Sequence, residues 1–169
     1  MCMDRIRCEL KWLGENLKTA GLGAFLAAAG CVMLWVSGGS GWYALRALRR
    51  SLPPLGLLFT LSLLRAGFCG LAAAVCVVCG REGWRKKRRL PAAAGWIGAA
   101  YLFGLGWYAV FFCTRMILFG AVLLCGGILA LGAAGGGAWK RKLPLSVWLG
   151  LVPALLLDLF FLILTLLTA

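Results

Sequence analysis

The sequence predicts an all-α integral membrane protein, a bundle of five transmembrane helices with its N-terminus in the cytoplasm. Of its 169 residues, 63% are hydrophobic and only 14% are charged, whereas a soluble domain is about a quarter charged. Apolar stretches of about 20 residues recur, and a helix of that length crosses a hydrocarbon core of roughly 30 Å. Basic residues are concentrated in alternate connections between these stretches, which is typical of cytoplasmic loops.

The first segment, 1–18, predicts an amphipathic helix that lies in the membrane interface before the first span. Its apolar residues Ile6, Leu10, Leu13 and Leu17 recur at helical spacing. Seven charged residues interrupt the segment, which is too many for the short apolar core of a cleavable signal peptide. We therefore expect no cleavable signal peptide here.

Five apolar runs follow, and we interpret them as five spans that form one transmembrane domain over 19–169. Their expected bounds are 19–38, 55–79, 92–112, 116–138 and 144–167. The third and fourth runs are nearly continuous, but together they are too long for a single span. We therefore expect a tight turn around Cys113–Arg115, and a chain of four spans is the alternative.

The expected orientation follows from the Lys and Arg residues of the connections. The N-terminal flank carries four, 80–91 carries six and 139–143 carries three, whereas the opposite side carries three in 39–54 and Arg115. Thirteen Lys and Arg residues on one side against four on the other is a strong bias, and these residues favour the cytoplasmic side. The bias favours five spans, because four would place two basic clusters on opposite sides.

The 24 glycines of the chain predict close contacts between helices. Lipid supplies no hydrophobic force between helices, so small residues at the contacts are needed for close approach of the backbones. The candidate contact faces are Gly23, Ala27 and Gly30 in the first span and Gly120, Gly127 and Ala134 in the fourth. A tight helical bundle is therefore expected.

Two ionisable residues, Arg65 and Asp158, lie deep inside the second and fifth spans. Charged residues at such depth usually face the bundle and find partners. Each lies about ten residues from the outer end of its span, roughly 15 Å below the outer surface at 1.5 Å per residue. Equal depth predicts an ion pair between them. Its role is either purely structural, or Arg65 also meets a ligand carboxylate.

Composition disfavours several other kinds of site. The net charge of +13 is spread over short clusters between apolar runs, which leaves no soluble basic face for nucleic acid. Cys76 and Cys79 form a CxxC, but the chain has no histidine and no second pair, so zinc is not expected. The eight cysteines do not resemble the disulfide framework of a secreted domain, and most are expected to pack as small apolar residues.

Three local patterns occur in order along the chain. The connection before the second span contains Trp42-Tyr43, nine further residues and then Pro53-Pro54. The third span ends in WYAVFFCTR, and the fifth begins in PLSVW. These patterns resemble the translocator protein family, the tryptophan-rich sensory proteins (TspO/MBR), whose members are five-span chains of about this length. The matched residues of the two later patterns are Trp107, Phe111, Phe112, Arg115, Pro144 and Trp148.

The sequence also departs from the family pattern. The Lys-Pro of the family's first loop is Leu48-Arg49 here, and the second-span tryptophan that lines the pocket of bacterial members falls on Ser62. The asparagine of the third span falls on Gly104. The resemblance therefore carries over the fold better than the chemistry of the pocket. In that fold, spans two and five are neighbours, as an Arg65–Asp158 pair requires.

The resemblance implies a receptor or carrier in a bacterial plasma membrane that binds hydrophobic ligands, such as porphyrins, other tetrapyrroles or sterol-like molecules, inside the bundle. The 39–54 connection is then a lid over the mouth of the site. The expected ligand-binding residues are Trp42, Tyr43, Pro53, Pro54, Arg65, Trp107, Phe111, Trp148 and Asp158. No metal, cofactor or catalytic residue is expected, and membrane lipid and a second copy of the chain are the further expected partners.

Two alternatives stay open at this point. One is a structural or partner-binding membrane protein without a ligand site, in which the small-residue faces serve helix association. The other is an enzyme that degrades porphyrin in light, as reported for some bacterial members of the family. The absence of histidine, of a metal-ligand cluster and of a nucleophile–base pair disfavours the enzyme. For tryptophans near span ends, an interfacial belt is the alternative to ligand contact.

Overall fold

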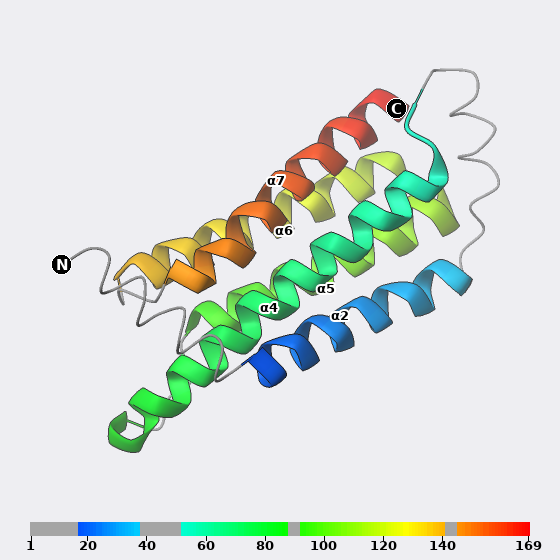
Figure 1. Ribbon diagram of the computed structural model, residues 1–169. Helices are drawn as coiled ribbons and strands as arrows, with labels where there is room; N and C mark the ends of the chain where they lie inside the picture. The colour runs from blue at the N-terminus through cyan, green and yellow to red at the C-terminus, as the bar shows by residue number, and fades with distance from the viewer. Residues whose placement is uncertain (1–16, 38–51, 88–91, 141–144) are drawn as a thin grey trace.

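The computed structural model describes residues 17–37, 52–87, 92–140 and 145–169, and it is helical almost throughout (Figure 1). Its elements are α2 (Leu17–Ser37), α4 (Leu55–Lys87), α5 (Ala92–Tyr108), the π-helix η1 (Ala109–Thr114), α6 (Ile117–Lys140) and α7 (Leu145–Thr168). No strand occurs within the described residues. The predicted all-α bundle is thus confirmed for this part of the chain, whereas most of the 1–18 helix predicted before it lies outside the described residues.

Four helical segments are long and apolar enough to cross a membrane, as in a multi-pass integral membrane protein. They are Leu55–Cys79, Ala92–Thr114, Ile117–Lys140 and Leu145–Thr168, and they match the second to fifth predicted spans closely. Helix α2 has 21 residues, but its described apolar segment, Gly21–Gly30, is shorter. A crossing of the membrane by α2 therefore stays a prediction.

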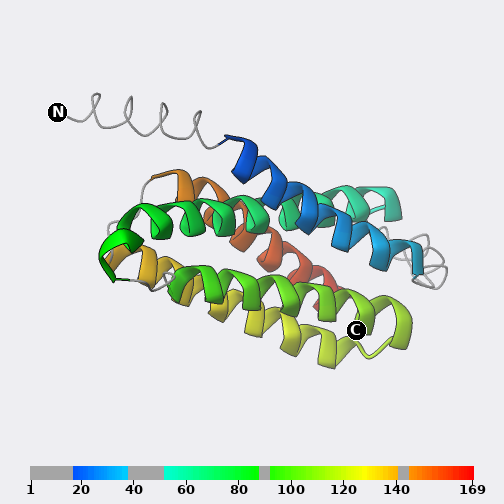
Figure 2. The ribbon, with the colours of Figure 1, turned by 90° about the horizontal axis from the view of Figure 1, so that it is seen from below.

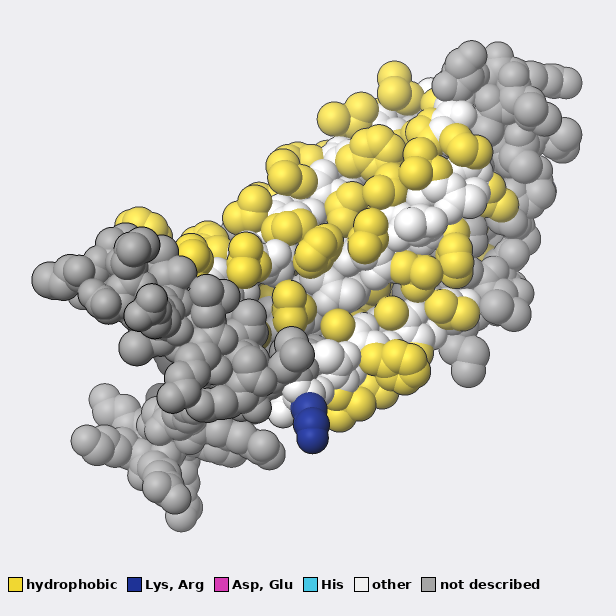
Figure 3. All heavy atoms as spheres, viewed as in Figure 1, with side chains coloured by type: hydrophobic (Ala, Val, Ile, Leu, Met, Phe, Trp, Pro, Cys, Tyr) yellow, Lys and Arg dark blue, Asp and Glu magenta, His cyan; other side chains and the backbone are white. Residues whose placement is uncertain are grey.

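The outer surface of the described bundle is apolar, as expected of a protein surrounded by lipid. Figure 3 shows hydrophobic side chains spread over the described part of one face, with a basic side chain at one end. Among the most exposed large apolar residues are Leu118 and Leu129, which are 76% and 74% exposed. Helix α4 continues eight residues past the apolar segment, to Lys87, and projects beyond its neighbours in Figure 1.

The helices form a closed ring in the order α2, α4, α7, α6, α5, with α4 also packed against α5. Figure 2 shows α2 beside α4 and α5 beside α6, with the later part of α7, drawn in red, between these pairs. The contact between α4 and α7 places spans two and five side by side, as the predicted ion pair requires. Because both α4 and α7 are long enough to span the bundle, a residue of one can meet a residue of the other wherever the two lie at the same depth.

The core of the bundle has two halves along its axis. One, which we call the alanine half, is built mostly of small buried residues, among them Ala72, Ala93, Ala100, Ala134 and Ala154. The other, which we call the aromatic half, is built around the buried rings Trp107, Tyr108, Phe111, Phe112 and Phe161.

The two halves meet at a thin layer, to which each of four helices contributes one residue. It consists of Arg65 on α4, Gly104 on α5, Gly127 on α6 and Asp158 on α7, and all four residues are buried. On every one of these helices, the alanine half lies to one side of this residue and the aromatic half to the other. We call it the ion-pair layer.

Small residues bring the helices into close contact, as predicted. Gly23 of α2 meets Gly70 of α4 so closely that a Cβ at Gly23 would lie 2.9 Å from the Gly70 carbonyl oxygen. Gly30 faces Tyr101 of α5, whose hydroxyl donates a hydrogen bond to the carbonyl oxygen of Ala27 at 2.8 Å. The predicted contact face of the first span is therefore confirmed.

The expected turn between the third and fourth spans is confirmed at Arg115. This residue has φ 62°, in the left-handed region, which an L-residue other than glycine adopts only at a cost. The helix before it widens into the π-helix Ala109–Thr114, a feature that the sequence does not predict. Within this segment, both Phe111 and Phe112 are buried, at 0% and 1% exposure. π-Helical segments of this kind are frequent at functional sites.

Candidate functional site

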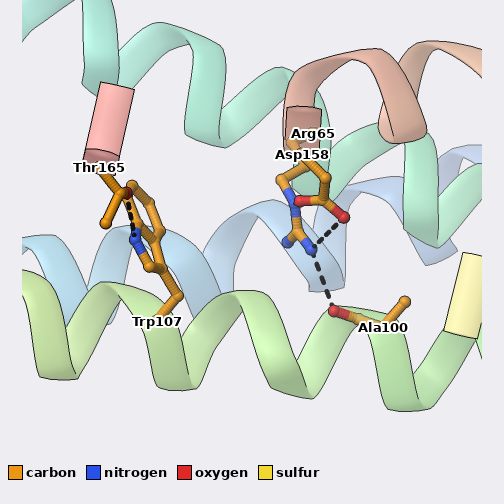
Figure 4. Close-up of polar contacts among 5 residues, drawn as sticks. All are labelled: Arg65, Ala100, Trp107, Asp158 and Thr165. Carbon is orange, nitrogen blue, oxygen red and sulfur yellow. Dashed lines mark hydrogen bonds and ion pairs between the residues drawn. The ribbon is translucent and has the colours of Figure 1, made fainter. Parts of the chain in front are cut away.

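The predicted ion pair between Arg65 and Asp158 is present and joins three helices (Figure 4). The Arg65 Nε donates to Asp158 Oδ1, and its Nη2 donates to Asp158 Oδ2 at 3.1 Å. Nη2 also donates to the carbonyl oxygen of Ala100 on α5 at 3.0 Å. Because Arg65 is 6% exposed and Asp158 0% exposed, both charges depend on these contacts rather than on water.

The ion-pair layer is shaped so that the guanidinium fits. A Cβ at Gly104 would overlap the Arg65 guanidinium, and a Cβ at Gly127 would lie 3.4 Å from Asp158 Oδ2. A side chain at 104 would therefore displace the guanidinium from its contacts with Asp158 and Ala100. This contact gives a physical reason for the absence of a side chain at the position where the resembled family has asparagine.

The aromatic half lies directly beside this layer, and its central residue is Trp107. The Trp107 Nε1 donates a hydrogen bond to Thr165 Oγ1 at 3.0 Å, as Figure 4 shows. The indole ring stacks on Phe111 with 5.3 Å between centroids, and its centroid lies 4.9 Å from that of Phe161. With only 3% of its surface exposed, Trp107 is a core residue and not part of an interfacial belt.

A small cavity of about 20 Å³ connects the ion-pair layer to the aromatic half. Its lining residues are Ser62, Arg65, Ala66, Tyr101, Gly104, Leu105, Trp107, Tyr108 and Phe161. A cavity needs about 10–15 Å³ to hold one water molecule, so this one has room for a single oxygen atom of water or ligand. Ser62 contributes a buried hydroxyl that has no hydrogen-bond partner among the described residues.

The structure brings together four of the nine predicted ligand-binding residues: Arg65, Trp107, Phe111 and Asp158 all lie at or next to this cavity.

Pro53 and Pro54 lie immediately before α4, at the end of the bundle that contains the aromatic half. The Pro54 carbonyl oxygen accepts hydrogen bonds from the backbone N–H groups of Leu57 and Leu58 at 3.0 and 3.3 Å. The two prolines thus direct the chain into α4.

The remaining predicted residues lie elsewhere. Trp42 and Tyr43, with the expected lid, lie outside the described residues. Trp148 packs against Gly135 and Trp139 at the far end of the alanine half. It precedes Thr165 by 17 residues on α7, which is about 25 Å of helix. The tertiary structure therefore separates Trp148 from the aromatic half that contains Trp107.

Neither Thr165 nor Gly104 is among the residues predicted for the site. A signal for Thr165 was present, because Asp158, Phe161 and Thr165 recur at the i, i+3, i+7 spacing of one helix face. No comparable signal exists for Gly104, which is one of many glycines and owes its role to the position of Arg65. Within the described ranges, no group of three or more His, Cys, Asp or Glu residues could hold a metal ion.

Comparison of the chain with protein-family models, curated proteins and solved structures found no match.

Proposed function

We propose that this chain is a multi-pass membrane protein that binds a hydrophobic small molecule of tetrapyrrole or sterol type between α4, α5 and α7. One observation carries the proposal: an ion pair, a buried serine hydroxyl and stacked aromatic rings meet at one cavity inside an apolar bundle. Ligand sites are mostly apolar with a few converging polar groups. Ionisable residues inside membrane spans mark functional sites by default. The resemblance of the chain's motifs to TspO/MBR supports the same class of ligand.

In this proposal, α2 also crosses the membrane, as the first of five spans, and the N-terminus is cytoplasmic, because thirteen Lys and Arg flank that side and four flank the other. The aromatic half then faces away from the cytoplasm, since Pro54 and Arg115 lie at its end of the bundle. The bacterial plasma membrane is the proposed location, and membrane lipid and a second copy of the chain are the proposed partners.

Binding of such a ligand requires rearrangement of the aromatic half. The cavity of about 20 Å³ has room for one oxygen atom, whereas pockets for drug-sized ligands measure roughly 300–1,000 Å³. The rings of Phe111 and Phe161, which lie against Trp107, must turn aside to admit the ligand. The alanine half offers no comparable space for a ligand, because the helix backbones there are already in contact.

Fluorescence quenching tests the proposal. Protoporphyrin IX titrated into the purified protein in detergent should quench tryptophan fluorescence saturably, after correction for a detergent blank. Trp107→Phe should weaken the affinity by up to about tenfold, because it removes aromatic contact area next to the cavity. Trp139→Phe is the control, since Trp139 is 77% exposed and lies outside the cavity lining. Quenching no greater than that of the blank, for the porphyrin and for a fluorescent sterol, would remove the proposal.

The alternative is a structural or partner-binding bundle without a ligand site, and the close packing of the described interior favours it. Phe111, Phe161 and Leu58 are all 0% exposed, so these side chains fill the space around the cavity. This alternative predicts that no tetrapyrrole or sterol shifts the unfolding temperature in detergent. It also predicts that Phe111→Ala, which opens additional volume beside Trp107, does not create saturable quenching.

A further inference from the structure

Ser62 is a polar side chain of the cavity that takes no part in the ion pair. It lies one helical turn before Arg65 on α4 and lines the cavity with it. The residue is 6% exposed, and its Oγ has no hydrogen-bond partner among the described residues. A buried hydroxyl without a partner is costly, so this position favours an additional oxygen or nitrogen atom within reach.

The charge of the neighbouring group limits what that atom can belong to. Arg65 already contacts Asp158 through two nitrogen atoms, so the pair is electrically neutral as a whole. A ligand carboxylate placed in the cavity would add an uncompensated negative charge inside the membrane, where isolated charges are strongly disfavoured. A neutral oxygen adds no such charge and still satisfies the hydroxyl.

We propose that this cavity is the polar subsite of the ligand site and that it selects a neutral oxygen, in particular the carbonyl oxygen of an ester or ketone. The Ser62 hydroxyl donates a hydrogen bond to this oxygen, and the Arg65 guanidinium lies beside it. The volume of about 20 Å³ admits one such atom. The body of the ligand then occupies the aromatic half. This inference rests on the proposed function and adds the class of head group.

Three porphyrins with the same ring and different substituents test the selection. Mesoporphyrin IX carries two carboxylates, its dimethyl ester carries neutral carbonyls, and etioporphyrin carries alkyl groups alone. Each is titrated by tryptophan quenching at about pH 7, where carboxylates are ionised, in about 0.5 M salt to screen the arginines of the 39–54 connection. We expect the ester to bind up to about tenfold more tightly than etioporphyrin, as one hydrogen bond allows, and more tightly than the diacid.

Ser62→Ala should abolish the advantage of the ester over etioporphyrin. Ser146→Ala is the matched control, because Ser146 is also 6% exposed, also has an Oγ without a partner among the described residues, and does not line the cavity. It should retain the advantage. Asp158→Asn should shift the preference toward the diacid, because it leaves the positive charge of Arg65 to attract a carboxylate.

The outcomes separate the two proposals. If none of the three porphyrins quenches saturably, this inference fails, and if the fluorescent sterol also fails to quench, the proposed function fails with it. If all three bind equally in the native protein, or if the diacid binds most tightly, the neutral subsite is overturned while the proposed function stands. An equal loss of the ester's advantage in Ser62→Ala and Ser146→Ala would also overturn it, because the effect would then not come from the cavity.

Discussion

The alanine half and the aromatic half of the bundle fill space in opposite ways. In the alanine half the helices approach so closely that a Cβ at Gly150 would lie 2.7 Å from the Phe68 carbonyl oxygen. In the aromatic half, side chains meet instead of backbones: the Trp107 ring of α5 and the Phe161 ring of α7 have 4.9 Å between their centroids. Lipid does not drive helices together, so each half depends on its own contacts. The alanine half thus joins the helices through their backbones, whereas the aromatic half contains the side-chain volume that the proposed ligand would have to displace.

Removal of one partner of the ion pair is expected to have the largest effect on stability, because the pair lies between the two halves and joins α4 to α7. Arg65→Leu or Asp158→Leu alone should lower the free energy of unfolding by about 3–5 kcal/mol, since each leaves a buried charge uncompensated. The double variant should be more stable than either single one. Denaturant unfolding in detergent measures this cycle, and strictly additive losses would show that the two side chains are not coupled.

Gly150→Ala tests whether backbone contact holds the alanine half together. The added Cβ would meet the Phe68 carbonyl oxygen and lie 2.8 Å from the Ala72 Cβ, so α4 and α7 must separate. Overpacking of this kind costs about 1–3 kcal/mol, which thermal unfolding in detergent detects. Gly136→Ala is the control, because nothing lies within 4 Å of a Cβ there. It should leave stability unchanged or raise it by up to about 1 kcal/mol. Equal effects at both positions would contradict the contact.

Thr165→Val probes the polar contact that orients the aromatic half. The substitution keeps the shape of the side chain and leaves the Trp107 N–H without its acceptor, at a cost of about 1–3 kcal/mol. We also expect a shift of the tryptophan emission maximum. Thr60→Val is the control, since Thr60 is exposed and its hydroxyl bonds to the Gly56 carbonyl oxygen of its own helix. A loss of stability as large in Thr60→Val would show that threonine removal, and not the indole contact, is responsible.

The smallest expected effect is at the turn beyond the aromatic half. Arg115 has a positive φ, so Arg115→Gly should raise the free energy of unfolding by about 0.5–1 kcal/mol through relief of the left-handed conformation. Arg115→Ala keeps that conformation unfavourable while it removes the charge, and it should not be stabilising. Thermal unfolding of the two variants separates the effect of backbone from that of charge. Equal stabilisation by both would assign the effect to the charge.

Much of the fold could be predicted because membrane spans depend on local composition. The bounds expected for the second to fifth spans differ from the observed helices by few residues, except that α4 continues to Lys87. An apolar span ends where charged residues begin, but the helix continues from Arg81 to Lys87. Five of these seven residues are Arg, Lys or Glu, which are good helix formers. The Arg65–Asp158 pair could also be predicted, because a buried charge requires an opposite charge at the same depth.

Less of the candidate site could be predicted. Trp107 and Trp148 were grouped through the resemblance, but the structure places them in different halves of the bundle. The π-helix Ala109–Thr114 was not predicted, because its residues also satisfy an α-helical pattern. Its wider turn buries Phe111 and Phe112 together.

The sequence by itself determined where the helices run, which of them are apolar enough for a membrane, and that Arg65 and Asp158 need each other. These properties follow from hydrophobicity and charge, which act at the level of single segments. Only the tertiary structure decided that Gly104 makes room for the guanidinium, that Thr165 binds the indole of Trp107, and that Ser62 borders the cavity between them. Such contacts depend on how each helix is rotated about its axis, and that rotation is set by the packing of the described helices against one another.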